Sequence, residues 1–211
     1  MNEEQAVLDF FAREENLPLG LSVAEQMDQI RMQLNSRFWR LLQTHFNDQF
    51  TQQHADFCAE TVEDRNEAEM LVGLKCSLNT PQSIFLFPML EQQYLGGSWR
   101  IFFGLMWNTP PTLPQLALPA VASLKTLLSE AGYKSNENFL AWQWTNLYPR
   151  RHDFLLRCSQ KPEILLNEIN EIAKPFISEH SELIKRANAA LQDAPPSMAI
   201  SLDQLRRKRT D

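Results

Sequence analysis

The segment WRIFFGLMW at residues 99–107 constrains the fold more than any other part of the chain. In a β-strand, successive side chains point to opposite faces of the sheet. One side of this segment would carry five large apolar side chains, namely Trp99, Ile101, Phe103, Leu105 and Trp107. The other side would carry Arg100, Phe102, Gly104 and Met106. Because both sides are largely apolar, we predict a central strand whose two faces are both covered.

Two further strand-like runs precede this segment. They are MLVGLKCSLN at residues 70–79 and SIFLFPML at residues 83–90, both rich in β-branched, aromatic or other apolar residues. The turn-forming sequence NTP ends the first run, and the pair GG leads into the segment at 99–107. Connections this short favour antiparallel pairing. The sequence therefore predicts a three-stranded antiparallel meander.

Three segments have apolar residues at the spacings of three and four that are typical of amphipathic helices, namely 23–50, 118–133 and 161–191. Ser22 and Glu25 form the pattern S-x-x-E of a capping box, which predicts the start of the first helix. The second segment has Pro119 near its start and Gly132 just past its end, the usual asymmetry of helix termini. Pro175 is expected to kink or break the third.

Two more strand-like runs lie between the second and third helices. They are NFLAWQWTN at residues 138–146 and HDFLLRCS at residues 152–159, separated by a turn-forming sequence. The predicted order of elements is therefore α-βββ-α-ββ-α. We predict an α+β fold in which one antiparallel sheet of about five strands packs against three main helices.

The remaining segments define the predicted domain organisation. Residues 1–20 are predicted to form an N-terminal arm with a short helix, which the sequence NLPLG would end, and residues 21–191 a single α+β domain. Residues 192–211 are predicted to be a flexible basic C-terminal tail. The polar stretch 51–68 is interpreted as either an extension of the first long helix or a surface connection.

Composition excludes several classes of protein. The chain of 211 residues has a formal net charge of −6, which argues against nucleic-acid binding because phosphate neutralisation needs a basic face. The three cysteines have no metal-ligand spacing and are interpreted as buried thiols in a reducing compartment. No signal peptide is recognised, and no apolar run approaches the length of a membrane span. We therefore expect a cytoplasmic protein without a membrane span.

The sequence contains none of the common catalytic motifs. The phosphate-binding patterns GxGxxG and GxxxxGK[ST], the nucleophile elbow GxSxG and the zinc motif HExxH are all missing. The four histidines are dispersed, so we expect no metal site; one built from His45 and His54 with a nearby aspartate is the alternative. We expect no cofactor and identify no catalytic residue. An enzyme with an unfamiliar site near strand ends, using Glu91, Arg100 or His152, remains an open alternative.

Three parts of the chain are candidate protein-binding sites. Phe10 and Phe11 in the N-terminal arm must pack on the domain or on a second subunit. Trp142 and Trp144 share one face of a predicted strand, with Leu140 beside them; aromatic residues at this spacing more often belong to a core than to a groove. Leu202 and Leu205 could dock in a groove of a partner. The cations that follow, Arg206, Arg207, Lys208 and Arg209, could bind an acidic protein surface, nucleic acid or anionic lipid, or could be a solvated terminus.

The order of elements between about residue 35 and residue 191 resembles that of the class I secretion chaperones. The matching segments are FWRLLQTHF, the meander to Trp107, LKTLLSEAGY, the pair FLAWQW and DFLLRC, and IAKPFISEHSELI. The resemblance is one of topology and composition without a diagnostic motif. It implies a dimer that holds an unfolded stretch of a client protein in hydrophobic grooves and by strand addition.

The leading hypothesis from the sequence is a non-enzymatic adaptor or chaperone-like factor that binds another protein, a client or a complex subunit, with a homodimer as a possibility. The alternative is a catalytically inactive nuclease-like or nucleic-acid-associated domain that uses the basic C-terminal tail. The strand-like runs at 83–90 and 99–107 lack the acidic residues that a metal-dependent nuclease needs.

Overall fold

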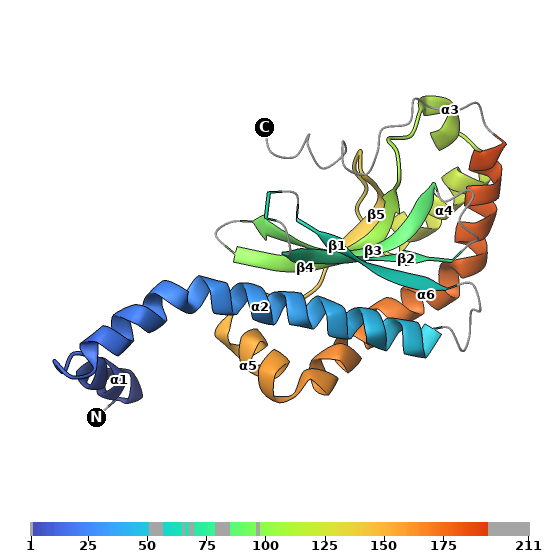
Figure 1. Ribbon diagram of the computed structural model, residues 1–211. Helices are drawn as coiled ribbons and strands as arrows, with labels where there is room; N and C mark the ends of the chain where they lie inside the picture. Colours follow the sequence, from blue (N-terminus) through green and yellow to red (C-terminus); the bar gives the residue numbers. More distant parts are fainter. Residues whose placement is uncertain are drawn as a thin grey trace.

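A computed structural model describes residues 2–50, 57–64, 66–67, 70–78, 85–95 and 98–193. One five-stranded sheet lies at its centre (Figure 1). Its strands are β1 (Cys58–Glu63), β2 (Leu71–Ser77), β3 (Leu86–Leu95), β4 (Ser98–Trp107) and β5 (Phe139–Trp144). They follow one another across the sheet in chain order, and every pair is antiparallel. The α+β class, the five-stranded antiparallel sheet and the meander over residues 70–107 are confirmed.

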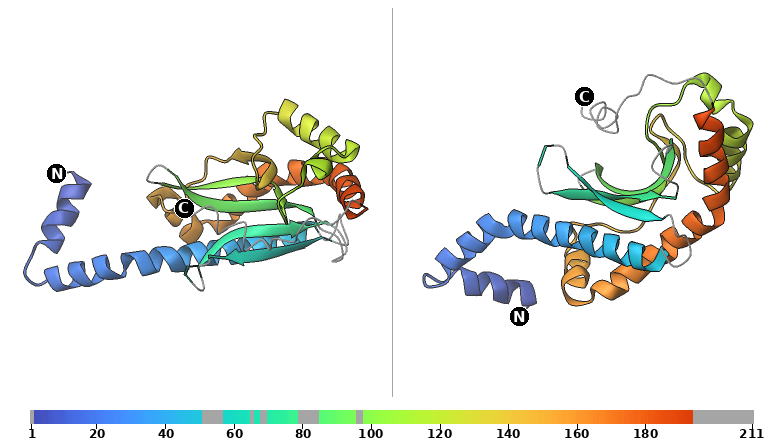
Figure 2. Two further views of the ribbon diagram at one scale, coloured as in Figure 1. Left: turned by 90° about the horizontal axis from the view of Figure 1, so that it is seen from above. Right: turned by 45° about the vertical axis from the view of Figure 1, so that its right-hand side comes forward.

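Four helices lie on one side of this sheet (Figure 1, Figure 2). They are α2 (Leu17–Phe50), α4 (Pro119–Glu130), α5 (His152–Gln160) and α6 (Pro162–Gln192). Two further helices are α1 (Glu3–Phe11) and α3 (Leu113–Leu116). The buried apolar side chains of α2, α4, α5 and α6 belong to a single cluster with the side chains of one sheet face. The main core is therefore the layer between the sheet and the helices.

The helix α5 corrects the prediction of a strand at residues 152–159. Phe154 and Cys158 are buried and lie four residues apart, which is the spacing of a helix. The ring of Phe154 lies 5.1 Å from that of Phe38 on α2, and Cys158 Sγ lies 3.6 Å from Leu34 O. The short apolar run fits the residue spacing of a strand as well as that of a helix, and packing against α2 stabilises the helix.

The fifth strand comes instead from the polar stretch interpreted as a helix extension or a connection. Ala59 in β1 is 1% exposed and faces the main core. Side chains of α2 bind its backbone: Asn47 accepts from Ala59 N at 2.8 Å, and Asn47 and Gln43 each donate to Ala59 O at 3.1 Å. A polar segment can thus form this edge strand because side chains of α2 supply hydrogen-bond partners to the backbone groups of Ala59 that point away from β2.

The start of α2 differs from the capping-box prediction at Ser22. The helix begins at Leu17, and Pro18 lies in its first turn, where its missing N–H costs no helical hydrogen bond. The change of direction falls at residues 12–16, between α1 and α2. Since α2 is continuous across residue 21, the predicted border between arm and domain lies inside a helix; the division into arm, domain and tail stays a prediction.

The ends of α4 and α6 agree with the sequence signals. Gly132 has φ of +88°, and it and Tyr133 donate to Ser129 O and Leu128 O, which closes the end of α4 as a Schellman motif. Pro175 lies within α6, which is continuous and changes direction along its length (Figure 1). The helix is therefore not broken at Pro175, and a kink centred on this residue stays a prediction.

Asn188 attaches the end of α6 to the beginning of β3. The side chain is 2% exposed. Its Oδ1 accepts from Phe85 N at 2.7 Å and Leu86 N at 2.8 Å, and its Nδ2 donates to Leu86 O at 2.9 Å and Ile184 O at 3.0 Å. One amide thus satisfies backbone groups of two elements that are far apart in the chain.

We expect Asn188→Ala to lower the free energy of unfolding by about 3 kcal/mol, because it leaves buried backbone donors and an acceptor without partners. Urea denaturation followed by circular dichroism measures this change. The matched control is Asn167→Ala at an exposed position of the same helix, where we expect a change of less than about 0.5 kcal/mol. Equal effects of the two substitutions would show that the Asn188 bonds do not hold α6 to the sheet.

Candidate binding surfaces

The second face of the sheet carries its own apolar cluster, which we call the aromatic face. Its buried members are Phe87, Met89, Phe102, Met106 and Phe139, each at most 3% exposed. Val62, Trp142 and Trp144 pack against them and are partly buried. All eight side chains belong to strands, and none of the described helices contributes to the cluster.

A β-bulge places three aromatic residues of β5 on this face. The register between β4 and β5 shifts where Leu105 and Met106 lie opposite Ala141 and Phe139. Leu140 and Ala141 consequently both face the main core, while Phe139, Trp142 and Trp144 face the other way. The structure thus confirms that the two tryptophans share a face and corrects the expectation that Leu140 lies beside them. The sequence spacing alone could not reveal the bulge.

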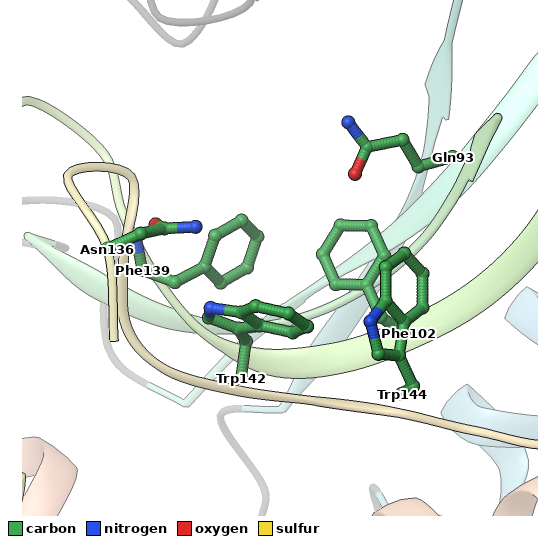
Figure 3. A pocket seen from close by; sticks show the side chains of 6 residues that line it. All are labelled: Gln93, Phe102, Asn136, Phe139, Trp142 and Trp144. Atoms are coloured by element: carbon green, nitrogen blue, oxygen red, sulfur yellow. The ribbon is translucent and has the colours of Figure 1, made fainter. Parts of the chain in front are cut away.

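The tryptophans line a small pocket on the aromatic face (Figure 3). The ring centroids of Trp142 and Trp144 are 5.5 Å apart, and that of Phe102 lies 5.4 Å from that of Trp144. Gln93 and Asn136 supply the polar part of the lining. About 30 Å³ is open to a water-sized sphere, which is room for little more than a methyl-sized group or one water molecule.

The pocket offers contacts suited to binding. Trp142 Nε1 is buried and has no hydrogen-bond acceptor within the described part of the chain, so it could donate to a carbonyl. Lys134 Nζ lies 5.5 Å from the centre of the Trp142 ring, and the guanidinium of Arg100 lies 5.4 Å from that of Trp144. The lining itself contains no histidine, cysteine or carboxylate. The arrangement is suited to holding an apolar side chain beside a backbone carbonyl.

Gly104 allows β5 to approach β4 at the pocket. A Cβ atom at this position would lie 2.7 Å from Trp142 Cα and would overlap Ala141 O, which is also a backbone atom. Neither neighbour can move without displacing the strand that carries both tryptophans. Gly104 therefore fixes the depth at which the Trp142 ring sits against Phe102.

We expect Gly104→Ala to lower the free energy of unfolding by about 3 kcal/mol and to change the tryptophan fluorescence, because β5 must shift. Chemical denaturation followed by fluorescence measures both effects. Gly132→Ala is the control: no atom lies within 4 Å of its Cβ, so only the positive φ is strained, at about 1 kcal/mol. If Gly104→Ala lowers the free energy of unfolding no more than Gly132→Ala does, the close approach of β4 and β5 is contradicted.

The helix α1 and the first half of α2 form a second candidate surface, which we call the hairpin (residues 2–34). It extends away from the sheet and the other helices (Figure 1, Figure 2). None of its residues up to 34 is buried. Its exposed large apolar side chains are Val7, Leu8, Phe10, Leu17, Leu19, Leu21, Val23 and Ile30. Leu8 is 63% exposed and Leu21 57%, so most of this apolar area faces solvent.

The two phenylalanines of the hairpin have different roles. Phe11 packs over Gly20, where an added Cβ would lie 3.0 Å from its ring, and so joins α1 to α2. Asn16 Nδ2 donates to Phe10 O at 3.0 Å and stabilises the turn between the helices. Phe10 is 46% exposed, and its ring meets that of Phe11 edge to face at 5.2 Å. The hairpin therefore has a defined shape but leaves Phe10 available to a partner.

The other sequence candidates are distributed as follows. Leu202, Leu205 and the four cations of the C-terminal tail lie outside the described residues, as does His54. Phe10 and Phe11 belong to α1, which lies apart from the sheet, whereas Trp142 and Trp144 belong to β5 (Figure 1). Within the described ranges, no three histidine, cysteine or acidic side chains lie close enough together to hold a metal ion. The aromatic face and the hairpin are thus two separate candidate surfaces.

Glu91, Arg100 and His152, the candidates for an unfamiliar enzyme site, belong to β3, β4 and α5 respectively. Glu91 lies on the aromatic face of β3, opposite Phe102. Arg100 Nε donates to Thr145 O at 2.6 Å and so ties the end of β5 to β4. His152 is the first residue of α5.

The edges of the sheet offer little unpaired backbone for strand addition. Ala59 on β1 is bound by side chains of α2. On β5, Trp142 N donates to Lys134 O at 2.7 Å, and Lys134 N donates to Trp142 O at 2.9 Å. Each edge strand is therefore occupied at one residue, Ala59 on β1 and Trp142 on β5, which hinders the pairing of an added strand there.

The structure corrects the expectation that all three cysteines are buried. Cys58 on β1 is exposed, whereas Cys76 and Cys158 are buried. Burial raises the pKa of the Cys76 thiol far above its usual range. Burial also raises the pKa of Cys158, although the nearby Arg37 acts in the opposite direction. Since the thiolate is the reactive form, both buried groups are protonated and unreactive near neutral pH.

We expect one thiol of the folded protein to react rapidly with Ellman's reagent at pH 8 and two to react only at the rate of unfolding. Cys58→Ser should remove the rapid phase, and Cys158→Ser should leave it unchanged. Stopped-flow absorbance measures both. A rapid phase that persists in Cys58→Ser would mean that one of the buried cysteines is reached by opening of the fold.

Among the described helices, none combines the length and apolarity that crossing a membrane requires. No family model matches the chain, and no curated protein or solved structure matches it either. The resemblance to class I secretion chaperones therefore rests on the order of elements, and β1 and α5 depart from the order that it implies.

Proposed function

We propose that this protein is a non-catalytic binding protein, an adaptor or chaperone-like factor, that holds another protein through its hairpin. The observation that carries the proposal is the exposed apolar surface of residues 2–34, most of which projects beyond the domain. Exposed apolar patches larger than isolated residues mark interaction surfaces in folded proteins. A projecting pair of helices presents such a surface without steric interference from the sheet.

The energetics of the hairpin favour association over solvation. Transferring a leucine or phenylalanine side chain from water to an interface gains roughly 1.5–3 kcal/mol. The free energy gained by burying several of these side chains therefore exceeds the free energy lost by ordering them. It also offsets the roughly 4–15 kcal/mol that association costs in lost translational and rotational freedom. A few well-buried side chains carry most of the binding energy of a protein interface, and Phe10 is the aromatic candidate on the hairpin.

The charges of the hairpin indicate the chemistry of the partner. Acidic residues outnumber basic ones along residues 2–31: the acids are Glu3, Glu4, Asp9, Glu14, Glu15, Glu25 and Asp28, against Arg13 and Arg31. Two identical hairpins brought face to face would repel each other. A partner with an apolar surface flanked by lysine and arginine is complementary, and electrostatic attraction would speed its association.

The test uses the full chain, tagged and expressed in its native cell. We expect size-exclusion chromatography with light scattering to give a mass above the 24.5 kDa of one chain. Leu19→Glu/Leu21→Glu should reduce the fraction in the complex at least tenfold, because it places charges in the apolar surface. The matched control is Ser22→Glu/Gln26→Glu, which adds the same charge at exposed polar positions of the same helix.

Two results would contradict the proposal. One is a monomer in the unmodified chain at micromolar concentration, with no partner bound. The other is a complex that the two leucine substitutions weaken no more than the control does. Mass spectrometry of the complex separates a second copy of this chain from a different protein, and we expect the latter.

A further inference from the structure

The end of the sheet where β4 begins and β5 ends carries arginines that lie over aromatic rings. We call this cluster the arginine patch and define it by Trp99, Arg100, Trp144, Tyr148, Arg150 and Arg151. The guanidinium carbon of Arg150 lies 4.9 Å from the centre of the Trp99 ring. That of Arg100 lies 5.4 Å from the ring of Trp144 and 5.3 Å from that of Tyr148. That of Arg151 lies 3.8 Å from the Tyr148 ring, so two cations share one tyrosine.

Backbone contacts hold the patch in shape. Arg151 N donates to Tyr148 O at 3.0 Å, which closes a turn with Pro149 at its second position. Arg100 Nε donates to Thr145 O at 2.6 Å. These bonds and the stacking on aromatic rings restrict the guanidinium groups before any ligand arrives. The conformational entropy lost on binding is therefore reduced.

The three arginines of the patch have no carboxylate partner among the residues that the structure describes. The ion pairs in those ranges involve Arg31, Arg157 and Lys185 instead. The chain has 26 acidic and 20 basic residues, so a group of cations without acids is not a consequence of composition. Like charges that are held close together repel one another, and a bound anion relieves this repulsion.

The start of α5 adds to the positive potential of the patch. Arg151 directly precedes the first turn of α5, and no side chain caps this end of the helix. The N–H groups and the dipole at such an end favour an anion. Asp153 in the first turn contributes one negative charge, which leaves the patch with a net positive charge.

We propose that the arginine patch binds an acidic segment of a partner protein that also carries apolar side chains. A guanidinium group presents paired N–H donors that match both oxygens of a carboxylate, so aspartate and glutamate side chains suit this surface. Tyr94 is 59% exposed, and its ring lies 5.9 Å from that of Trp99. It supplies a contact for an apolar side chain beside the cations. Arginine clusters recognise acidic motifs in this way.

A single-stranded nucleic acid is the competing ligand, because it combines negative charge with bases that stack on aromatic residues. Its affinity comes from neutralising several phosphates along the backbone, and the patch has three cations. Guanidinium groups already lie over the rings of Trp99, Trp144 and Tyr148, where a base would stack. The net charge of −6 also opposes a ligand of such high charge density. These features favour a short acidic segment of a protein.

The patch gives the protein a second site with the opposite charge preference. The hairpin is acidic and favours a basic partner, whereas the patch favours an acidic one. One chain then holds two partners of opposite charge, as an adaptor does. The proposal does not depend on the hairpin: Leu19→Glu/Leu21→Glu should change the affinity of the patch by less than about twofold.

Fluorescence anisotropy with the full chain tests the patch. The probe is a fluorescein-labelled peptide of four Asp-Glu-Leu repeats, and the neutral control peptide has four Asn-Gln-Leu repeats. We expect the acidic peptide to bind with a micromolar Kd at low salt, and the neutral one at least tenfold more weakly. Arg150→Glu/Arg151→Glu should weaken binding of the acidic peptide at least tenfold. The matched control Lys125→Glu/Arg186→Glu makes the same charge change at exposed positions of α4 and α6 and should have less than a twofold effect.

A second variant separates recognition by the guanidinium group from general attraction between charges. Arg151→Lys keeps the charge and loses the planar pair of donors, so we expect it to weaken binding about threefold or more. Circular dichroism and urea denaturation should show that the variants are as stable as the unmodified chain, because the side chains at 150 and 151 are exposed.

Three results would overturn the proposal. One is that the unmodified chain does not bind the acidic peptide. Another is that the patch variant and its matched control weaken binding equally, which would indicate a general effect of charge. The third is that an oligothymidylate of twelve nucleotides binds more tightly than the peptide and loses this affinity in the patch variant. None of these results concerns the hairpin, whose partner is tested by light scattering and its own leucine variant.

Discussion

The ring of Phe103 on β4 meets the ring of Phe176 on α6 edge to face, with 5.6 Å between their centroids, and Tyr133 packs against both. This contact joins the sheet to the helical layer. The other side of β4 is apolar as well, with Phe102 against Trp142 and Trp144. Both sides of such a strand must be shielded from water, and the helices shield one of them. Within the described residues, Trp142 and Trp144 of β5 pack against the second side and stay partly exposed.

The sequence predicted the fold well where the period of its apolar residues was unambiguous. The segment at 99–107, the meander and the termini of α4 could be recognised because alternation, short turns and a glycine past the helix end are local signals. The run at 152–159 was assigned the wrong period because Phe154 and Leu155 are compatible with either structure. The strand β1 was missed because its edge is satisfied by Asn47, a residue on a different element. Both errors reflect tertiary contacts that no local pattern contains.

The candidate surfaces were predictable to a different extent. The sequence indicated that Phe10 and Phe11 must pack on the domain or on a second subunit; in the structure Phe11 packs over Gly20, and Phe10 is 46% exposed. The pocket depends on the bulge at Leu140 and on the absence of a side chain at Gly104. These two features determine which residues share a face and how closely the strands approach. The spacing of the two tryptophans in the sequence reveals neither feature. The sequence therefore identified the pair but could not predict which residues surround it.

The continuity of α2 has a mechanical consequence. A single helix of 34 residues carries the hairpin at one end and the core residues Phe38, Trp39 and Phe46 at the other. Its exposed half, residues 17–34, is about 27 Å long at 1.5 Å per residue. The helix curves along its length but is not interrupted (Figure 1). The domain and whatever the hairpin binds would therefore be joined by continuous hydrogen-bonded turns rather than by a flexible linker, and a load applied at one end would reach the main core at the other.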